Sequence, residues 1–162
     1  VYVATYNDEP QDSSYLTRLG SNGTQVWTKF FNDPDSQSFQ LGGTPKVKLL
    51  ANGNVVLGLS QQPTRILNII NPANGSVLYT STQKSGIINE LETDASSNIY
   101  IAGSNTPQKF DSKATLLASG KLNSVEISSG GLALYGNAIY VGAGAFDSKG
   151  EMTLYLSKYN NQ

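Results

Sequence analysis

Two acidic segments, residues 8–12 and 32–35, contain the side chains in this sequence best suited to chemistry. Their oxygen-bearing side chains are Asp8, Glu9, Asp12, Asn32, Asp33 and Asp35. Paired carboxylates can cleave glycosides, and clustered oxygen atoms can bind calcium. Neither segment has the central glycine and terminal glutamate of a calcium loop, and Pro34 adds no ligand. We therefore interpret both segments as solvated loops and expect no metal site.

The sequence contains no histidine and no cysteine. Histidine is the usual general base near neutral pH and the commonest ligand of zinc, so most acid–base and zinc chemistry is excluded. Without cysteine there is no thiolate nucleophile and no disulfide framework. No serine lies in a nucleophile-elbow motif. We expect a protein that is not an enzyme and that needs no cofactor.

Aromatic side chains offer a second kind of site, because their faces can stack on sugar rings. Trp27 is the single tryptophan, and it lies in an alternating run typical of an outer strand. Tyr2, Tyr100 and Tyr140 occur at one position of a repeated segment, as a structural role predicts. We therefore favour packing over sugar binding for these four residues. The outer-strand equivalents of Trp27 are expected at Tyr79 and at or near Leu117.

Two glycosylation sequons begin at Asn22 and Asn74. Each asparagine is followed by glycine, the pair preferred in a type I′ hairpin turn, where both central residues have positive φ. Turn formation therefore explains these residues without any glycan. Both sequons nevertheless fall on equivalent turns of consecutive repeats, where an asparagine faces solvent and can carry a sugar. Glycosylation of Asn22 and Asn74 is thus a second reading, for a chain made on a glycosylating secretory route.

The charge balance is close to neutral, with 11 Lys and Arg against 12 Asp and Glu. Nothing in the sequence concentrates positive potential, so neither nucleic acid nor an anionic membrane is expected as a partner. The apolar runs are far shorter than the roughly 20 residues that span a bilayer, so no membrane insertion is expected. The 162 residues suffice for one domain with a substantial core. Because the sequence starts at Val1 within an apparent strand, we expect a piece of a longer protein.

A short apolar segment occurs four times, at intervals of 40 to 54 residues. The copies are VYVATY from Val1, VVLGLS from Val55, IYIAGS from Ile99 and IYVGAG from Ile139. Each is followed by a second aligned segment, namely LTRL, LNII, PQKF and LSKY. Turn-forming residues and further strand-like runs lie between these segments. This spacing is typical of repeated sheets of about four strands.

The repeat predicts an all-β chain of about 14 antiparallel strands. Two complete units have four strands each, and the units at both ends have three. The first unit lacks its innermost strand, and the last lacks its outermost strand. We expect these units within a single domain, at residues 1–41, 42–84, 85–122 and 123–162.

The third unit combines Asp94 and Asn98 with IYIAG at residues 99–103, and Asp111 follows Lys109 and Phe110. In these residues, and in Asn22-Gly23 with Trp27-Thr28, the chain resembles the β-propeller repeat proteins whose blades read D-x-x-G-N-I-Y-V-A-G. The resemblance implies blades of four antiparallel strands, belonging to a partial propeller or to part of a larger one. Propellers include binding proteins, scaffolds and enzymes, so it leaves the function open.

From these observations we expect a non-catalytic structural or protein-interaction module, outside the cell or on its surface. Its partners would be further blades of the same polypeptide or neighbouring copies, joined at open blade edges. The alternative is a carbohydrate-binding or polysaccharide-active propeller that recognises glycans through tyrosines and loop carboxylates. A cofactor-bearing quinoprotein-like propeller is disfavoured, because a partial ring lacks a complete axial site.

Overall fold

The computed structural model describes residues 1–7, 13–32, 44–61, 64–84, 86–103, 107–120, 128–136, 138–146 and 149–160. Within these ranges the chain forms 14 strands and no helix, so no described helix could span a membrane. The acidic segments at residues 8–12 and 33–35 lie outside the described residues.

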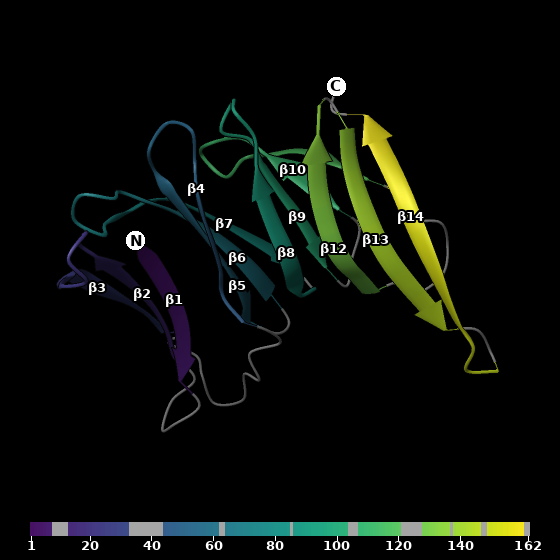
Figure 1. Ribbon diagram of the computed structural model, residues 1–162, viewed down its shortest axis with the longest axis horizontal. Coiled ribbons are helices and arrows are strands. Elements are labelled where there is room, and N and C mark those ends of the chain that lie inside the picture. Colours follow the sequence, from purple (N-terminus) through teal and green to yellow (C-terminus); the bar gives the residue numbers. More distant parts are fainter. Residues whose placement is uncertain are drawn as a thin grey trace.

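The strands form four antiparallel sheets, each built from strands consecutive in the sequence (Figure 1). Sheet 1 contains β1 (Tyr2–Asn7), β2 (Ser13–Leu19) and β3 (Gln25–Asn32). Sheet 2 contains β4 (Lys46–Leu49), β5 (Val55–Gln61), β6 (Thr64–Ile70) and β7 (Val77–Lys84). Sheet 3 contains β8 (Ile88–Thr93), β9 (Ile99–Gly103), β10 (Gln108–Phe110) and β11 (Leu116–Ser119). Sheet 4 contains β12 (Ser128–Tyr135), β13 (Ala138–Phe146) and β14 (Met152–Asn160). The expected all-β class and the grouping of strands are confirmed for the described residues.

The four sheets follow one another in chain order, from the N-terminus in sheet 1 to the C-terminal end in sheet 4 (Figure 1). Neighbouring sheets contact each other through their first strands: β1 packs on β4, β4 on β8, and β8 on β12. The described strands form an open row and no closed ring.

Alternate residues of β5 contact different sheets, as expected for a pleated strand covered on both faces. Val55 and Leu57 pack in one apolar cluster with Leu16 of sheet 1, whereas Val56 packs in a second cluster with Ile88 of sheet 3. We call the side of a sheet that faces the following sheet its forward face, and the opposite side its rear face. The core therefore lies between sheets, where forward and rear faces meet.

The Asn-Gly pairs form a different turn from the one expected. The amide of Gly23 donates to the carbonyl oxygen of Gly20 at 3.1 Å. The amide of Gly20 in turn donates to the carbonyl oxygen of Thr24 at 2.8 Å. Gly23 has a φ of 80°, whereas the φ of Asn22 is not positive. This geometry is a type I turn followed by one left-handed residue and a bulge. The prediction of type I′ turns is wrong. The turn at Asn22-Gly23 has one more residue than a type I′ turn allows, and at Asn74-Gly75 the amide of Gly75 donates to the carbonyl oxygen of Asn71 at 2.9 Å, which closes a longer turn.

Asp94 organises the turn between β8 and β9. Its carboxylate accepts hydrogen bonds from the amides of Ser96 and Asn98, the side chain of Asn98 and the hydroxyl of Tyr100, at 2.8 to 2.9 Å. Burial opposes ionisation of this carboxyl, but the hydrogen bonds from Asn98, Tyr100 and Ser96 prevail and lower the pKa of Asp94. The aspartate, asparagine and tyrosine of the repeat motif thus have a structural role in this unit.

The lowered pKa of Asp94 makes the stability of the fold depend on acid. A carboxyl whose pKa is lower in the folded state stabilises the fold above its unfolded pKa of about 4, and this contribution disappears as pH falls through the folded value. We expect Asp94→Asn to reduce the free energy of unfolding by about 1 kcal/mol at pH 7. The difference from wild type should narrow below about pH 4, as urea titrations at several pH values can measure. A difference that stays constant with pH would contradict this role.

Candidate functional site

Both sequon asparagines lie on exposed turns. Asn22 lies between β2 and β3, and Asn74 occupies the corresponding turn between β6 and β7. The side-chain oxygen of Asn22 accepts hydrogen bonds from the amide and hydroxyl of Thr24, at 3.1 and 2.7 Å. That of Asn74 accepts one from the amide of Ser76 at 3.0 Å. Both side chains stabilise their turns, and both are open to solvent.

Trp27 lies at the junction of sheets 1 and 2. Its indole nitrogen donates to the carbonyl oxygen of Pro72 at 3.0 Å, and Arg18 donates to the same oxygen at 2.8 Å. The ring packs beside Tyr2 with 6.0 Å between centroids, and it lies 3.0 Å from where a Cβ of Gly75 would be. Gly75 therefore allows the turn of sheet 2 to approach the indole. The interpretation of Trp27 as a residue that packs between units is confirmed.

A cation lies opposite the repeated tyrosine in three of the four sheets. Tyr2 is paired with Arg18, Tyr100 with Lys109, and Tyr140 with Lys158, each directly across the strand register. The ammonium groups of Lys109 and Lys158 both lie 5.8 Å from the centroid of the paired ring. Such contacts stabilise the pair by about 0.5–1 kcal/mol at exposed sites. The cations share one column of the sequence repeat, but only the strand register shows that they face the tyrosines.

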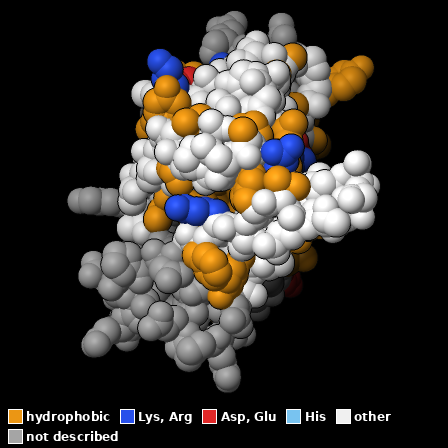
Figure 2. Space-filling view, turned by 90° about the vertical axis from the view of Figure 1, so that its left-hand side faces the viewer, with side chains coloured by type: hydrophobic (Ala, Val, Ile, Leu, Met, Phe, Trp, Pro, Cys, Tyr) orange, Lys and Arg blue, Asp and Glu red, His pale blue; other side chains and the backbone are white. Residues whose placement is uncertain are grey.

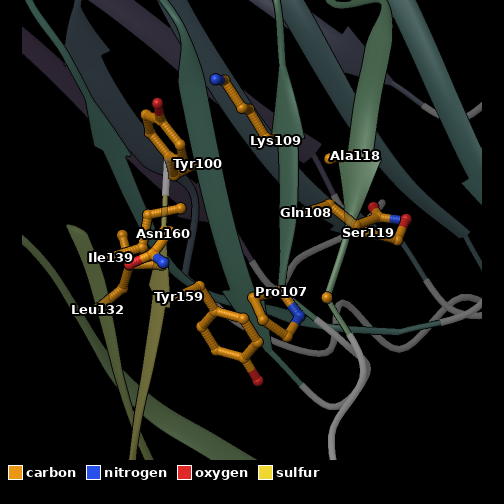
Figure 3. A pocket seen from close by; sticks show the side chains of 11 residues that line it. Tyr100, Pro107, Gln108, Lys109, Ala118, Ser119, Leu132, Ile139, Tyr159 and Asn160 are labelled. Atoms are coloured by element: carbon orange, nitrogen blue, oxygen red, sulfur yellow. The ribbon is translucent and has the colours of Figure 1, made fainter. Parts of the chain in front are cut away.

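A groove of about 170 Å³ separates sheet 3 from sheet 4. Tyr100, Lys109 and Ala118 line it from sheet 3, and Ile139 and Tyr159 line it from sheet 4 (Figure 3). The remaining lining residues are Pro107, Gln108, Ser119, Gly120, Leu132 and Asn160. The groove thus combines apolar and aromatic surface with a few polar groups, as small-ligand sites do.

The groove occupies the place where the junction of sheets 1 and 2 holds an indole. Trp27 pairs with Arg18, and Ala118 pairs with Lys109 in the same register, so Ala118 is the equivalent of Trp27. In sheet 2 the equivalent is Tyr79, as expected, whereas in sheet 3 it is one residue beyond Leu117. A methyl group in place of an indole leaves space between the sheets. The sequence did not predict this space, because it depends on the register.

The forward face of sheet 4 is uncovered by any described residue. Met152, Leu154 and Leu156 are 58%, 75% and 75% exposed along β14. They lie opposite Phe146, Gly144 and Gly142 of β13, respectively. Nothing lies within 4 Å of the position that a Cβ of Gly142 would occupy. Long apolar side chains beside glycines give this face an uneven apolar surface of a kind that soluble monomers seldom expose.

The rear face of sheet 1 is the second uncovered apolar surface. Val3, Val26 and Phe30 are exposed there, and Tyr15 packs edge-on against Phe30 with 4.7 Å between ring centroids. Figure 2 shows this end of the molecule, where hydrophobic side chains lie among uncharged polar groups and a few basic ones. The two end sheets thus each expose apolar side chains on one face.

Arg65 of β6 is buried between sheets 2 and 3, with 3% of its surface exposed. One of its nitrogens donates to the side-chain oxygen of Gln108 at 2.5 Å, and its Nε and Nη1 have no hydrogen-bond partner. Burial lowers the pKa of this guanidinium. The side-chain nitrogens are too enclosed for an incoming anion, so we regard Arg65 as a structural feature that costs stability.

The described residues provide little else for catalysis. They contain no group of three or more acidic, histidine or cysteine side chains that could hold a metal. Lys48 of β4 forms an ion pair with Glu92 of β8 at 2.8 Å, across sheets 2 and 3. The surfaces most suited to function are therefore the two open faces and the groove.

No protein-family model matches this chain, and no curated protein matches it. Among solved structures, the chain is similar to a protein of unknown function from Bacteroides caccae, whose crystal structure was determined at 1.35 Å resolution. The TM-score is 0.52 and the sequence identity is 16%. The match covers 98% of this chain but 59% of that protein, so this chain spans less than two thirds of its length. At this identity the likeness shows a shared fold alone.

Proposed function

We propose that this chain is a series of propeller-type blades that acts as a non-catalytic protein-interaction module. Three features support the blade interpretation: the order of strands within each sheet, the contacts between first strands of successive sheets, and the recurrence of one motif at equivalent positions. The partial units at both ends leave the row open. Further blades of the same polypeptide or neighbouring copies would extend it.

The observation that carries the proposed function is the exposed apolar face of sheet 4. The forward faces of sheets 1 to 3 each lie against the sheet that follows. The equivalent face of sheet 4 presents Leu154 and Leu156 to solvent. Covering such side chains contributes roughly 25 cal/mol per Å² of apolar surface, so this face favours binding to another sheet.

Self-association of the isolated chain tests this function. We expect light scattering to show a weight-average mass that rises with concentration in the micromolar range. Leu156→Lys should weaken association by about tenfold or more, because a charge would be buried in the contact. Leu117→Lys is the matched control, since this leucine is also exposed but lies on the outer strand of sheet 3. A wild-type protein that stays monomeric at every concentration would refute self-association through this face.

An extracellular or cell-surface location is part of the proposal. It is supported by the absence of cysteine, the low content of charged residues, 14%, and the exposure of Asn22 and Asn74. The Pro72 carbonyl contacts sheet 1 while Asn74 in the same turn stays exposed, so a glycan there is compatible with contact between sheets. If the sequons carry glycans, enzymatic deglycosylation should lower the mass of the protein isolated from its native source.

Carbohydrate binding is the second candidate function, and the groove between sheets 3 and 4 favours it. Tyr159 supplies ring surface there, and Lys109 supplies a polar group. We expect Ala118→Trp to fill the groove, as Trp27 fills the equivalent space in sheet 1. If calorimetric titration detects monosaccharide binding, this substitution should abolish it, whereas Leu117→Trp on the same strand should not. Sugar binding that survives Ala118→Trp would place the site elsewhere.

A further inference from the structure

The junction of sheets 1 and 2 offers a template for a contact between the two ends of the molecule. Sheet 1 presents Tyr2, Arg18 and Trp27 on its forward face, where two of these side chains bind the Pro72 carbonyl in the turn of sheet 2. In the strand register, Tyr140 and Lys158 of sheet 4 are equivalent to Tyr2 and Arg18. Sheet 4 therefore has the tyrosine and cation that sheet 1 uses at its junction.

The rear face of sheet 1 resembles the rear faces that are buried inside the molecule. Val3 pairs with Thr17, and Thr17 with Thr28, whose hydroxyl groups lie 2.9 Å apart. In sheet 2 the equivalent row contains Leu57 and Asn68, and Asn68 accepts a hydrogen bond from Thr80 at 2.8 Å. Leu57 is fully buried, since sheet 1 covers it. Sheet 1 thus exposes a rear face of the type that another sheet covers elsewhere in the fold.

The turn between β2 and β3 can also present an acceptor. Leu19 pairs with Gln25 at the end of β2, as Ile70 pairs with Val77 at the end of β6, so Ser21 corresponds to Pro72 by position, in a turn that is one residue shorter. The Ser21 carbonyl lies on an exposed turn. It could accept a hydrogen bond from a cation on another sheet, as the Pro72 carbonyl does from Arg18.

We propose that the forward face of sheet 4 binds the rear face of sheet 1 in a second copy of this chain, with Lys158 directed at the Ser21 carbonyl of that copy. The inference rests on the proposed interaction function and specifies its partner and geometry. Because the two faces differ, the contact is head-to-tail and leaves one free face of each kind on every dimer. Such a contact continues into a ring or a filament.

Chemical cross-linking tests this geometry, and the absence of native cysteine makes each introduced cysteine unique. Lys158→Cys and Ser21→Cys proteins are prepared separately, mixed at micromolar concentration and treated with a short bis-maleimide. We expect mixed dimers in about tenfold excess over those formed when either protein is mixed with Thr82→Cys. Thr82 is an exposed control position on the outer strand of sheet 2.

The possible outcomes separate this inference from the proposed function. Preferential cross-linking of Lys158→Cys to itself would show a symmetric contact and overturn the head-to-tail geometry, while association itself would stand. Association in light scattering without mixed cross-links would likewise overturn the geometry alone. A strictly monomeric wild-type chain without cross-links would overturn both, since the face would then require a sheet from a longer polypeptide or another protein.

Discussion

Gly103→Ala is expected to destabilise the fold more than any other single-methyl substitution in the described strands. A Cβ at Gly103 would lie 1.5 Å from the carbonyl oxygen of Ile87 and 2.7 Å from its carbon. Both are backbone atoms next to a bulge in β8, where Ile88 pairs with Gly103, so they can move only by displacing the strand. We expect a loss of about 3 kcal/mol or more in the free energy of unfolding.

Urea denaturation followed by circular dichroism measures this effect. Gly142→Ala is the matched control, because Gly142 also lies on the second strand of its hairpin but has no atom within 4 Å of the Cβ position. The control should change the free energy of unfolding by less than about 1 kcal/mol. Equal stabilities for the two variants would show that the backbone at Ile87 lies farther from Gly103 than in this structure.

Trp27→Ala is expected to have the second-largest effect, because it removes the main side chain at the junction of sheets 1 and 2. The substitution deletes the indole contacts with Tyr2 and Gly75, and it removes one of the two donors to the Pro72 carbonyl. Losses of about 3 kcal/mol are usual for truncation of a large aromatic residue in a core, and the partial burial of Trp27 places this one near that lower value.

Tyr79→Ala is the control for Trp27→Ala, since Tyr79 occupies the same position of the repeat in sheet 2 but is 42% exposed. Thermal denaturation followed in the far ultraviolet can compare the two without a fluorescent tryptophan. We expect Tyr79→Ala to cost about 1 kcal/mol at most. If Tyr79→Ala were the more damaging change, Trp27 would not be the residue that joins the first two sheets.

The strands could be predicted from the sequence, because alternating apolar residues and turn-forming clusters are local signals. The type of turn could not, since Asn-Gly also fits a longer loop in which only Gly23 is left-handed. The groove was not predicted either. It depends on the register that places Ala118 opposite Lys109, and strand registers are set by contacts across the sheet.

The open faces were also beyond a sequence-based prediction. Leu57 and Leu156 are both leucines in strand patterns, yet Leu57 is fully buried and Leu156 is 75% exposed. Sheet 1 covers the face of sheet 2 that carries Leu57, whereas no described sheet covers the face of sheet 4 that carries Leu156. The sequence analysis predicted incomplete units from their missing strands, and it expected association at strand edges. In the structure, however, the exposed apolar side chains lie on the faces of the two end sheets.

The most direct test of the account is the rate at which peroxide oxidises Met152. This residue is the single methionine, it lies on the forward face of sheet 4, and it is 58% exposed. Methionine sulfoxide forms according to exposure, so intact mass reports the accessibility of that face alone. We predict that oxidation slows severalfold as protein concentration rises, and that Leu156→Lys abolishes this dependence. An oxidation rate of wild-type protein that is the same at every concentration would contradict the claim that this face binds another sheet.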